Sequence, residues 1–314
     1  MNDDTPPTAW ERQVLERLLR DTLVEQRRAR RWRIFFRLLS VLLILLVVGL
    51  LGTNAGVPQV TSRHTAMVQL NGIIAPGTEA DADLVMESLR AAYDNKHVAG
   101  VVLRIDSPGG SPVQAGRIND EIHRLRKLHP NVPLYAVIDD ICASGGYYVA
   151  VAADRIYADK ASVVGSIGVL MNGFGFVGAM DKLGIERRLL TAGAHKGFLD
   201  PFSPQNPDEV AHAHELLTAI HGQFIDVVKQ GRGERLKDDP RLFSGLVWTG
   251  AQGVELGLVD ALGDADTVAR EVFKADEVVD YTVRRAYFEK FIRSASSEAT
   301  AAALDTLSNS LRWR

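Results

Sequence analysis

The chain has 314 residues, of which 46% are hydrophobic, and its formal net charge is −3. This length is enough to bury one substantial core, with or without appended segments. The nearly balanced charge gives no global electrostatic reason to expect nucleic acid as a partner. The single cysteine, Cys142, excludes a disulfide or a cysteine-rich zinc site built within one chain.

An apolar run over residues 34–52 predicts a transmembrane signal anchor. Arg37 and Ser40 are its only polar residues, and at about 1.5 Å per residue the run just spans a hydrocarbon core. Arginines precede the run, and no charge follows it until Arg63. By the positive-inside rule, residues 1–33 form a basic head in the cytoplasm, and the chain after the anchor lies on the far side of the membrane.

Two other interpretations of this run stay open. A buried core helix this uniformly apolar would need to be enclosed on all sides. A cleaved signal peptide ending near Ala55 would normally have a shorter charged region before its apolar core. An uncleaved anchor fits the long head better than either alternative.

A linker, a main domain and a tail follow the predicted anchor. Residues 53–64 have the small and polar composition of a linker. Within residues 65–280, short Val- and Ile-rich runs alternate with segments of helical periodicity, which predicts an α/β fold with a largely parallel sheet. Residues 281–314 form a predicted helical or flexible tail. The expected strands lie at 66–70, 98–105, 134–138 and 162–169, and the expected helices at 82–93, 113–128, 145–152, 208–229, 250–256 and 266–273.

Two of the expected strands are followed by polar, glycine-rich turns. The first turn, residues 104–111, reads Arg-Ile-Asp-Ser-Pro-Gly-Gly-Ser, and its paired glycines let the backbone expose N–H groups to a ligand. An ordinary strand-to-helix turn is the commoner explanation of such a pair. By itself, this motif identifies no function.

The second turn, residues 140–148, reads Asp-Ile-Cys-Ala-Ser-Gly-Gly-Tyr-Tyr and places Ser144 at the N-terminus of an expected helix. Unpaired N–H groups and the helix dipole favour negative charge there, as a nucleophilic serine and its developing oxyanion require. A serine at this position is more often a simple N-cap, so both roles stay open. Cys142 is interpreted as a small packing residue.

A nucleophilic serine needs a base, which is most often histidine. No histidine lies between His129 and His195, and lysine is the alternative where burial leaves its amine neutral. Lys196 lies in an apolar, glycine-punctuated stretch, residues 191–202, that could desolvate an amine. The other lysines that follow the serine closely are Lys160 and Lys182, and the later histidines His212, His214 and His221 fall on an expected surface helix.

Together these motifs resemble the short, single-copy bacterial form of the signal peptide peptidase A family, to which the SohB-like peptidases are closely related. Four motifs in order carry the resemblance: Asp-Ser-Pro-Gly-Gly (106–110), Ala-Ser-Gly-Gly-Tyr-Tyr (143–148), Val-Gly-Ser-Ile-Gly-Val (164–169) and Ala-Gly-Ala-His-Lys (192–196). The resemblance implies a crotonase-like, Clp-protease-like α/β fold preceded by one transmembrane helix. It also implies a serine peptidase of the bacterial cytoplasmic (inner) membrane, with its catalytic domain on the periplasmic side.

The resemblance assigns roles residue by residue. It implies that Ser144 is the nucleophile, Lys196 the general base and Ser166 the serine that orients the lysine amine. The N–H groups of Gly110 and Gly145 would form the oxyanion hole, and no metal or cofactor is implied. The implied substrates are cleaved signal peptides or other unfolded, membrane-derived peptides. The short relatives assemble into homo-oligomeric rings, so a similar ring is expected here.

Two other functions remain open. An acyl-CoA-processing crotonase relative would share the fold and the oxyanion turns, but it would need neither Ser144 nor Lys196, and an exported domain has no access to coenzyme A. A catalytically idle scaffold that binds membrane proteins would have no use for the intact Ser-Lys pair. Labelling of Ser144 by a serine-directed probe and a peptide-hydrolysis assay separate these functions from the peptidase.

Overall fold

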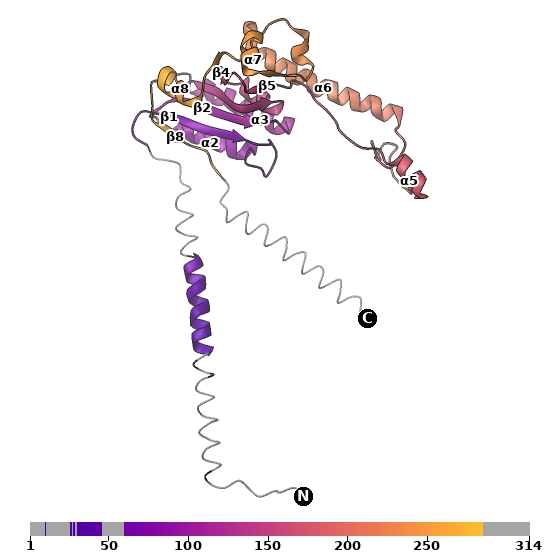
Figure 1. Cartoon of the computed structure of the whole chain (residues 1–314), viewed down its shortest axis with the longest axis horizontal. Helices are drawn as coiled ribbons and strands as arrows, with labels where there is room; N and C mark the ends of the chain where they lie inside the picture. Colours follow the sequence, from indigo (N-terminus) through magenta and orange to yellow (C-terminus); the bar gives the residue numbers. More distant parts are fainter. Residues whose placement is uncertain (1–9, 11–25, 27, 29, 46–59, 285–314) are drawn as a thin grey trace. The chain divides into compact units, whose positions relative to one another are not determined.

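The computed structural model describes residues 10, 26, 28, 30–45 and 60–284 (Figure 1). The chain divides into two units, Met1–Gly56 with Ala286–Arg314, and Val57–Arg285. In the first unit, residues 30–45 form a helix with exposed apolar side chains. No helix in the described part of the chain is long and apolar enough to cross a membrane. Residues 46–52 of the predicted anchor, most of the head and residues 285–314 of the tail lie outside the described residues.

The second unit is built on an 8-stranded sheet with the order β6-β5-β3-β2-β1-β8, in which β4 pairs with β3 and with β7. Among the described residues, every strand pair is parallel except β5 with β6. The predicted α/β fold with a largely parallel sheet is therefore confirmed. The strands are β1 (His64–Asn71), β2 (Val98–Ser107), β3 (Leu134–Ala143), β4 (Arg155–Ala158), β5 (Val163–Gly165), β6 (Val247–Thr249), β7 (Ala261–Leu262) and β8 (Val278–Asp280).

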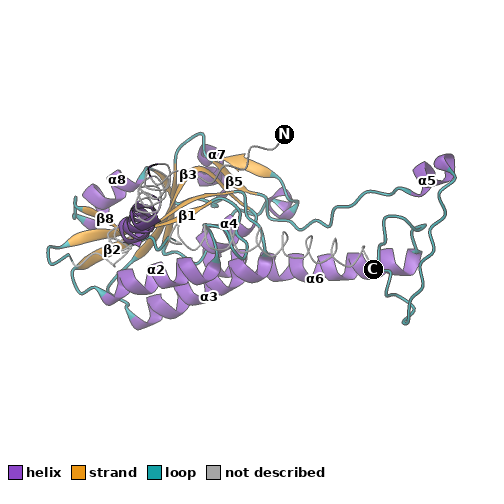
Figure 2. Cartoon of the chain, turned by 90° about the horizontal axis from the view of Figure 1, so that it is seen from below, coloured by secondary structure: helices purple, strands orange, loops and turns teal. Residues whose placement is uncertain are grey.

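Helices cover one face of the sheet, and a smaller apolar cluster that includes Val268 and Phe273 packs on Val102 and Val137 at the other face. The covering helices are α2 (Ala82–Asp94), α3 (Pro112–Leu128) and the short α4 (Gly145–Ala150) (Figure 2). Helix α3 begins at Ser111, whose hydroxyl accepts a hydrogen bond from the Gln114 N–H, with Pro112 at the first helical position. The central strands β2 and β3 are buried along most of their length, which explains their continuous apolar runs in the sequence.

Two elements differ from their predictions. The strand expected over 162–169 is shorter, because Ser166 has a φ of 52°, a left-handed conformation that ends β5 after Gly165. The helix expected over 266–273 is a short α8 (Ala265–Thr267) followed by a π-helical segment, η3 (Val268–Phe273). The remaining elements are α5 (Val177–Leu183), α6 (Pro207–Arg232), α7 (Gly250–Leu256) and the 3-10 turns η1 (Gly233–Arg235) and η2 (Pro240–Phe243).

Between β5 and α6 the chain leaves the sheet as a segment that we call the arm, residues 168–206. No residue of α5, which lies in the arm, is buried. The chain returns along α6, whose 26 residues make a helix about 39 Å long, and the arm lies at the end of α6 away from the sheet (Figure 2). The arm exposes several large apolar side chains to solvent. These side chains include Leu170, Met171, Phe174, Phe176, Leu183, Ile185 and Leu190.

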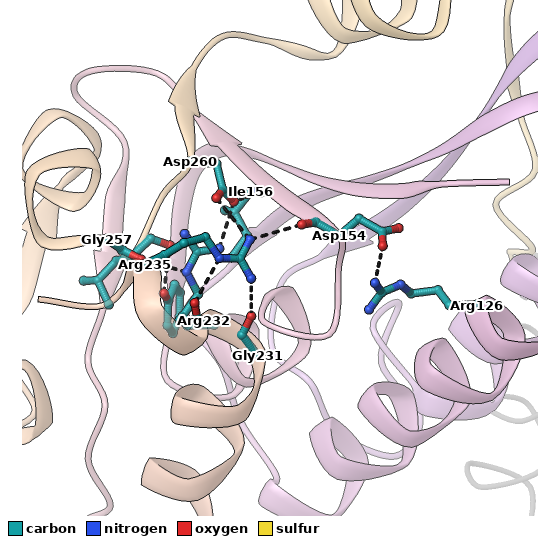
Figure 3. A network of polar contacts seen from close by, with 10 residues as sticks. Arg126, Asp154, Ile156, Gly231, Arg232, Arg235, Gly257 and Asp260 are labelled. Atoms are coloured by element: carbon teal, nitrogen blue, oxygen red, sulfur yellow. Dashed lines mark hydrogen bonds and ion pairs between the residues drawn. The ribbon is translucent and has the colours of Figure 1, made fainter. Parts of the chain in front are cut away.

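A buried ion-pair network attaches the C-terminal end of α6 to the sheet (Figure 3). Arg232, only 1% exposed, donates from Nε to the Gly257 carbonyl (2.7 Å) and from Nη1 to Asp260 Oδ2 (2.8 Å). The Ile156 N–H of β4 donates to the same carboxylate oxygen (2.7 Å). Burial by itself raises the pKa of Asp260, but the hydrogen bond and charge of Arg232 outweigh it, so that the pKa lies below its usual range.

Replacing Arg232 with methionine is expected to lower the free energy of unfolding by about 3 kcal/mol, because the Asp260 carboxylate would lose its buried cation and keep only Arg235, which is 41% exposed. The folded-state pKa of Asp260 is depressed, so its stabilisation is present above the unfolded pKa of about 3.9 and is lost as the pH falls through the folded value. Urea unfolding of the full chain at neutral pH and below about pH 4 measures both effects.

The exposed pair of Arg270 with Glu271 supplies the control, because its two side chains are 56% and 64% exposed. Arg270→Met should change the free energy of unfolding by less than about 1 kcal/mol. The Arg232 variant should also lose less stability on acidification than the wild type. An Arg232→Met protein as stable as Arg270→Met would contradict the structural role given to this network.

Candidate active site

Ser144 occupies the sharp turn between β3 and α4. Its backbone has φ 50° and ψ −121°, a strained conformation for a residue with a side chain. The Ser144 N–H donates to the Gly165 carbonyl (2.9 Å), and the Tyr148 N–H donates to the Ser144 carbonyl (2.9 Å). The side chain is half-buried and makes no capping hydrogen bond to α4. The hydroxyl therefore does not act as an N-cap, and the turn resembles the strained strand-to-helix elbow that presents nucleophilic serines.

The glycine turn after β2 lies directly against this elbow. A Cβ placed on Gly109 would lie 2.6 Å from the Gly145 nitrogen, and one on Gly145 would lie 3.1 Å from the Gly110 nitrogen. Only glycines allow this approach, and Gly109 also needs its positive φ of 98°. In the described part of the chain, the amides of Gly110 and Gly145 donate no hydrogen bond to another residue. Two backbone donors thus lie together beside Ser144.

The loop that holds this turn in place comes from the end of β1. The Ile74 N–H donates to the Gly109 carbonyl (2.9 Å), and the Ser111 N–H donates to the Ile74 carbonyl (2.8 Å). The Ser107 hydroxyl also accepts a hydrogen bond from the Gly109 N–H (3.1 Å). These contacts leave the Gly110 N–H directed to the other side of the backbone.

Ser166 directly follows the neighbouring strand β5, whose last residue, Gly165, accepts the Ser144 N–H. Ala143 and Gly165 are register partners in the parallel pair of β3 and β5, so the two serines follow them at the same edge of the sheet. Ser166 is half-buried, and its N–H donates to the Leu246 carbonyl (2.8 Å). The structure therefore brings together four of the five predicted site residues: Ser144, Ser166, Gly110 and Gly145.

Lys196 lies elsewhere in the same chain. Its side chain is exposed on the arm, so the desolvation expected from the apolar stretch 191–202 is not seen among the described residues. Its loop contacts Glu209 in the first turn of α6, whereas the nucleophile side of the molecule meets α6 at Phe224, whose ring centroid lies 5.2 Å from that of Tyr148. The 15 residues from Glu209 to Phe224 span about 22 Å of helix. One chain therefore does not bring Ser144 and Lys196 together.

His221 makes a contact near the site that was not predicted from the sequence. It is half-buried rather than solvated, and its Nε2 donates to the Ile167 carbonyl (3.1 Å), next to Ser166. Because a carbonyl only accepts, Nε2 carries the proton. His221, Phe224 and Val228 follow the i, i+3, i+7 spacing of a buried helical stripe, and this pattern could have predicted the contact.

Cys142 lies two residues before Ser144 and is fully buried. Burial raises the pKa of its thiol, so the sulfur stays protonated and is a poor nucleophile. This environment agrees with the packing role predicted for it. Within the described residues, no group of three or more His, Cys, Asp or Glu side chains is placed to hold a metal ion.

Comparisons with known proteins match the chain to a peptidase family and to several proteases. The model of peptidase family S49 matches residues 126–279. A putative protease of Synechocystis, slr0021, is 32% identical over 203 residues, which cover 65% of this chain and 71% of the relative. The putative signal peptide peptidase SppA of Enterococcus faecium is 29% identical over 231 residues, which cover 71% of this chain and 67% of the relative.

A third relative is named as an antiporter and is much longer than this chain. The Na(+)/H(+) antiporter NhaA of Brucella abortus is 42% identical over 212 residues, and this match covers 66% of the chain but only 29% of the antiporter sequence. The fold, the serine elbow and the protease relatives together place the chain among the serine peptidases. The chain belongs to peptidase family S49, with signal peptide peptidase A and SohB among its relatives. The resemblance seen in the sequence is thus confirmed.

Proposed function

We propose that this protein is a membrane-anchored serine endopeptidase that hydrolyses cleaved signal peptides or other unfolded, membrane-derived peptides. The observation that carries the proposal is the strained, uncapped Ser144 beside two backbone amides that donate to no described residue. Within family S49, this arrangement supports a crotonase-like and Clp-protease-like catalytic fold. Hydrolysis of an unfolded apolar peptide by the full chain, compared with Ser144→Ala, tests the proposal directly.

The proposed base is Lys196, supplied to each Ser144 by a neighbouring copy in a ring-shaped homo-oligomer. Two observations support this arrangement. Helix α6 contacts the Lys196 loop at Glu209 and the nucleophile side at Phe224, about 22 Å apart along its axis. The arm that carries Lys196 also exposes an apolar surface that no described residue of the chain covers. A second copy would cover this surface and would desolvate the amine at the same time.

In the proposed reaction, the neutral Lys196 amine takes the proton of the Ser144 hydroxyl as the oxygen attacks a peptide carbonyl. The Gly110 and Gly145 N–H groups stabilise the oxyanion, and each such donor typically contributes on the order of 3 kcal/mol to lowering the barrier. The ammonium then returns its proton to the leaving amine. Water hydrolyses the acyl-enzyme by the same route. The Ser166 hydroxyl accepts a hydrogen bond from the amine and orients it.

Hydrolysis should rise with pH from about 6 to 10, because only the neutral amine accepts the serine proton. Ser166→Ala should lower kcat by about tenfold, the effect expected for one lost hydrogen bond, while the nucleophile, the base and both oxyanion donors remain. A metal chelator should have no effect. Rate profiles of the two proteins over this range are the measurement. A rate that falls above neutral pH in folded enzyme, or activity lost with the chelator, would refute a neutral-lysine mechanism.

The proposed topology puts the catalytic domain on the periplasmic side of the bacterial inner membrane. A reporter that works only outside the cytoplasm, fused after Gly52, should therefore be active, and one that works only inside should be silent. Reversing the charges at Arg27, Arg28, Arg30, Arg31 and Arg33 should disturb this orientation, whereas the same change at Arg12, Arg17 and Arg20, farther from the anchor, should disturb it less. Cytoplasmic activity of the fused reporter would contradict both the location and the substrate class.

A further inference from the structure

Glu209 makes two contacts that bracket Lys196. One carboxylate oxygen lies 3.3 Å from His195 Nδ1, and the other accepts the Leu199 N–H at 3.0 Å. These two residues stand directly before Lys196 and three positions after it. Glu209 therefore ties both ends of the short loop that carries the proposed base.

Glu209 is buried although the residues around it are mostly exposed. Its side chain is 11% exposed, while the neighbouring residues Asp208 and Ala211, and the loop residues 191–196, are exposed. A carboxylate loses hydration on burial, and charge-assisted hydrogen bonds offset that loss. Both of those bonds are made to the Lys196 loop. The first turn of α6 also favours a negative charge, because the N-terminal end of the helix dipole is positive.

The loop itself needs a fixed support. Leu199 has a φ of 53°, a left-handed conformation that is unfavourable for a leucine. Three consecutive turns surround Lys196, with the N–H groups of Lys196, Phe198 and Asp200 donating to the carbonyls of Gly193, His195 and Gly197. The Glu209 contact is made to the strained Leu199, where it holds the loop against relaxation.

The contacts of Glu209 leave the amine itself free. Among the described residues, Lys196 forms no ion pair with Glu209 or with any other carboxylate. An amine paired with a carboxylate would be held protonated and could not accept a proton. Glu209 instead binds the backbone and the imidazole beside the lysine, so it orients the loop without pairing with the base.

We propose that Glu209 is a positioning residue for catalysis, which fixes the Lys196 loop so that the amine reaches the serine of the neighbouring copy in one orientation. This inference rests on the proposed function, in which Lys196 is the base. Glu209→Ala should lower kcat by about a hundredfold with little change in KM, because small misplacements of a catalytic group have effects of this size. Glu209→Gln should keep most of the activity, since its amide oxygen still accepts the Leu199 N–H.

Glu215 supplies the matched control on the same helix. Its side chain is 79% exposed and pairs only with His212, and Glu215→Ala should keep kcat within about twofold, as expected for an exposed pair. Far-ultraviolet circular dichroism and the size of the full-length oligomer in detergent identify any variant that has lost its fold. A Glu209→Ala enzyme with wild-type kcat, or a Glu209→Gln enzyme as impaired as Glu209→Ala, would overturn the inference.

Co-assembly of two variants separates positioning of the base from general damage. When full-length Glu209→Ala is co-expressed with Ser144→Ala and mixed oligomers are purified by two tags, activity should return, since the Ser144→Ala copy brings an intact Lys196 loop. Co-assembly with Lys196→Ala should not restore it, because neither copy then supplies a well-placed base. Restoration by Lys196→Ala would overturn the inference. Failure of the proposed function has another signature: Lys196→Ala alone would retain activity.

Discussion

Ser144→Ala and Lys196→Ala are each expected to lower kcat/KM for peptide hydrolysis by about 10⁴-fold or more, because a nucleophile and its base act as one unit. The fold should survive both changes. The Ser144 hydroxyl makes no capping hydrogen bond to α4, and the Lys196 side chain is exposed on the arm. Steady-state hydrolysis of an unfolded apolar peptide by the full chain in detergent is the measurement.

The double variant should be little worse than either single variant, since removing the second member of a disabled pair costs almost nothing. Ser244→Ala is a suitable control, because Ser244 is exposed and its hydroxyl binds only the Arg241 carbonyl of its own turn. Residual activity near that of the wild type in Lys196→Ala would remove lysine as the base while leaving Ser144 as the nucleophile.

Mixed oligomers of Ser144→Ala and Lys196→Ala are expected to regain about one quarter of the wild-type activity, because random assembly of two kinds of copy unites an intact serine with an intact lysine at about one site in four. Each variant by itself stays inactive. The expectation follows from the proposal that a neighbouring copy supplies the base, since α6 separates the Lys196 loop from the nucleophile side within one copy. Co-expression with two different tags and tandem purification gives the mixed species.

The control for this experiment is co-assembly of Ser144→Ala with the double variant Ser144→Ala/Lys196→Ala. That mixture contains no intact serine, so it should remain inactive. If the complementary mixture is also inactive although mixed oligomers are recovered, the base is not shared between copies. If the wild type is fully active but is recovered only as single copies, the active site is not shared between copies.

The fold could be predicted for those elements whose sequences consist mainly of buried apolar residues. Strands β2 and β3 appear as apolar runs because both of their faces are covered. The end of β5 could not be predicted, since no local pattern indicates the left-handed backbone of Ser166, whose N–H donates to the Leu246 carbonyl 80 positions later. The π-helical segment η3 has the same apolar spacing as an ordinary helix, and no local pattern distinguishes the two.

The candidate site was predictable to the extent that it lies at the edge of one parallel sheet. The turns after β2, β3 and β5 meet there because the carboxyl ends of parallel strands point the same way, so Gly110, Ser144 and Ser166 come together. The position of Lys196 was not predictable from the sequence. Its apolar surroundings in the sequence suggest burial, but among the described residues the Lys196 side chain is exposed. In the sequence, Glu209 has the position of an ordinary acidic residue in the first turn of a helix. No sequence pattern indicates its contacts with the Lys196 loop.

The length of α6 gives the proposed enzyme a built-in dependence on its own concentration. The Lys196 loop and the nucleophile side of one copy meet this helix about 22 Å apart along its axis. If a neighbouring copy supplies the base, as proposed, a single chain would be inactive until it assembles with others. Specific activity should then fall on dilution and recover on concentration, without any inhibitor or processing step. Under this proposal, the protease would be latent where copies are few, and local crowding of the chain would activate it.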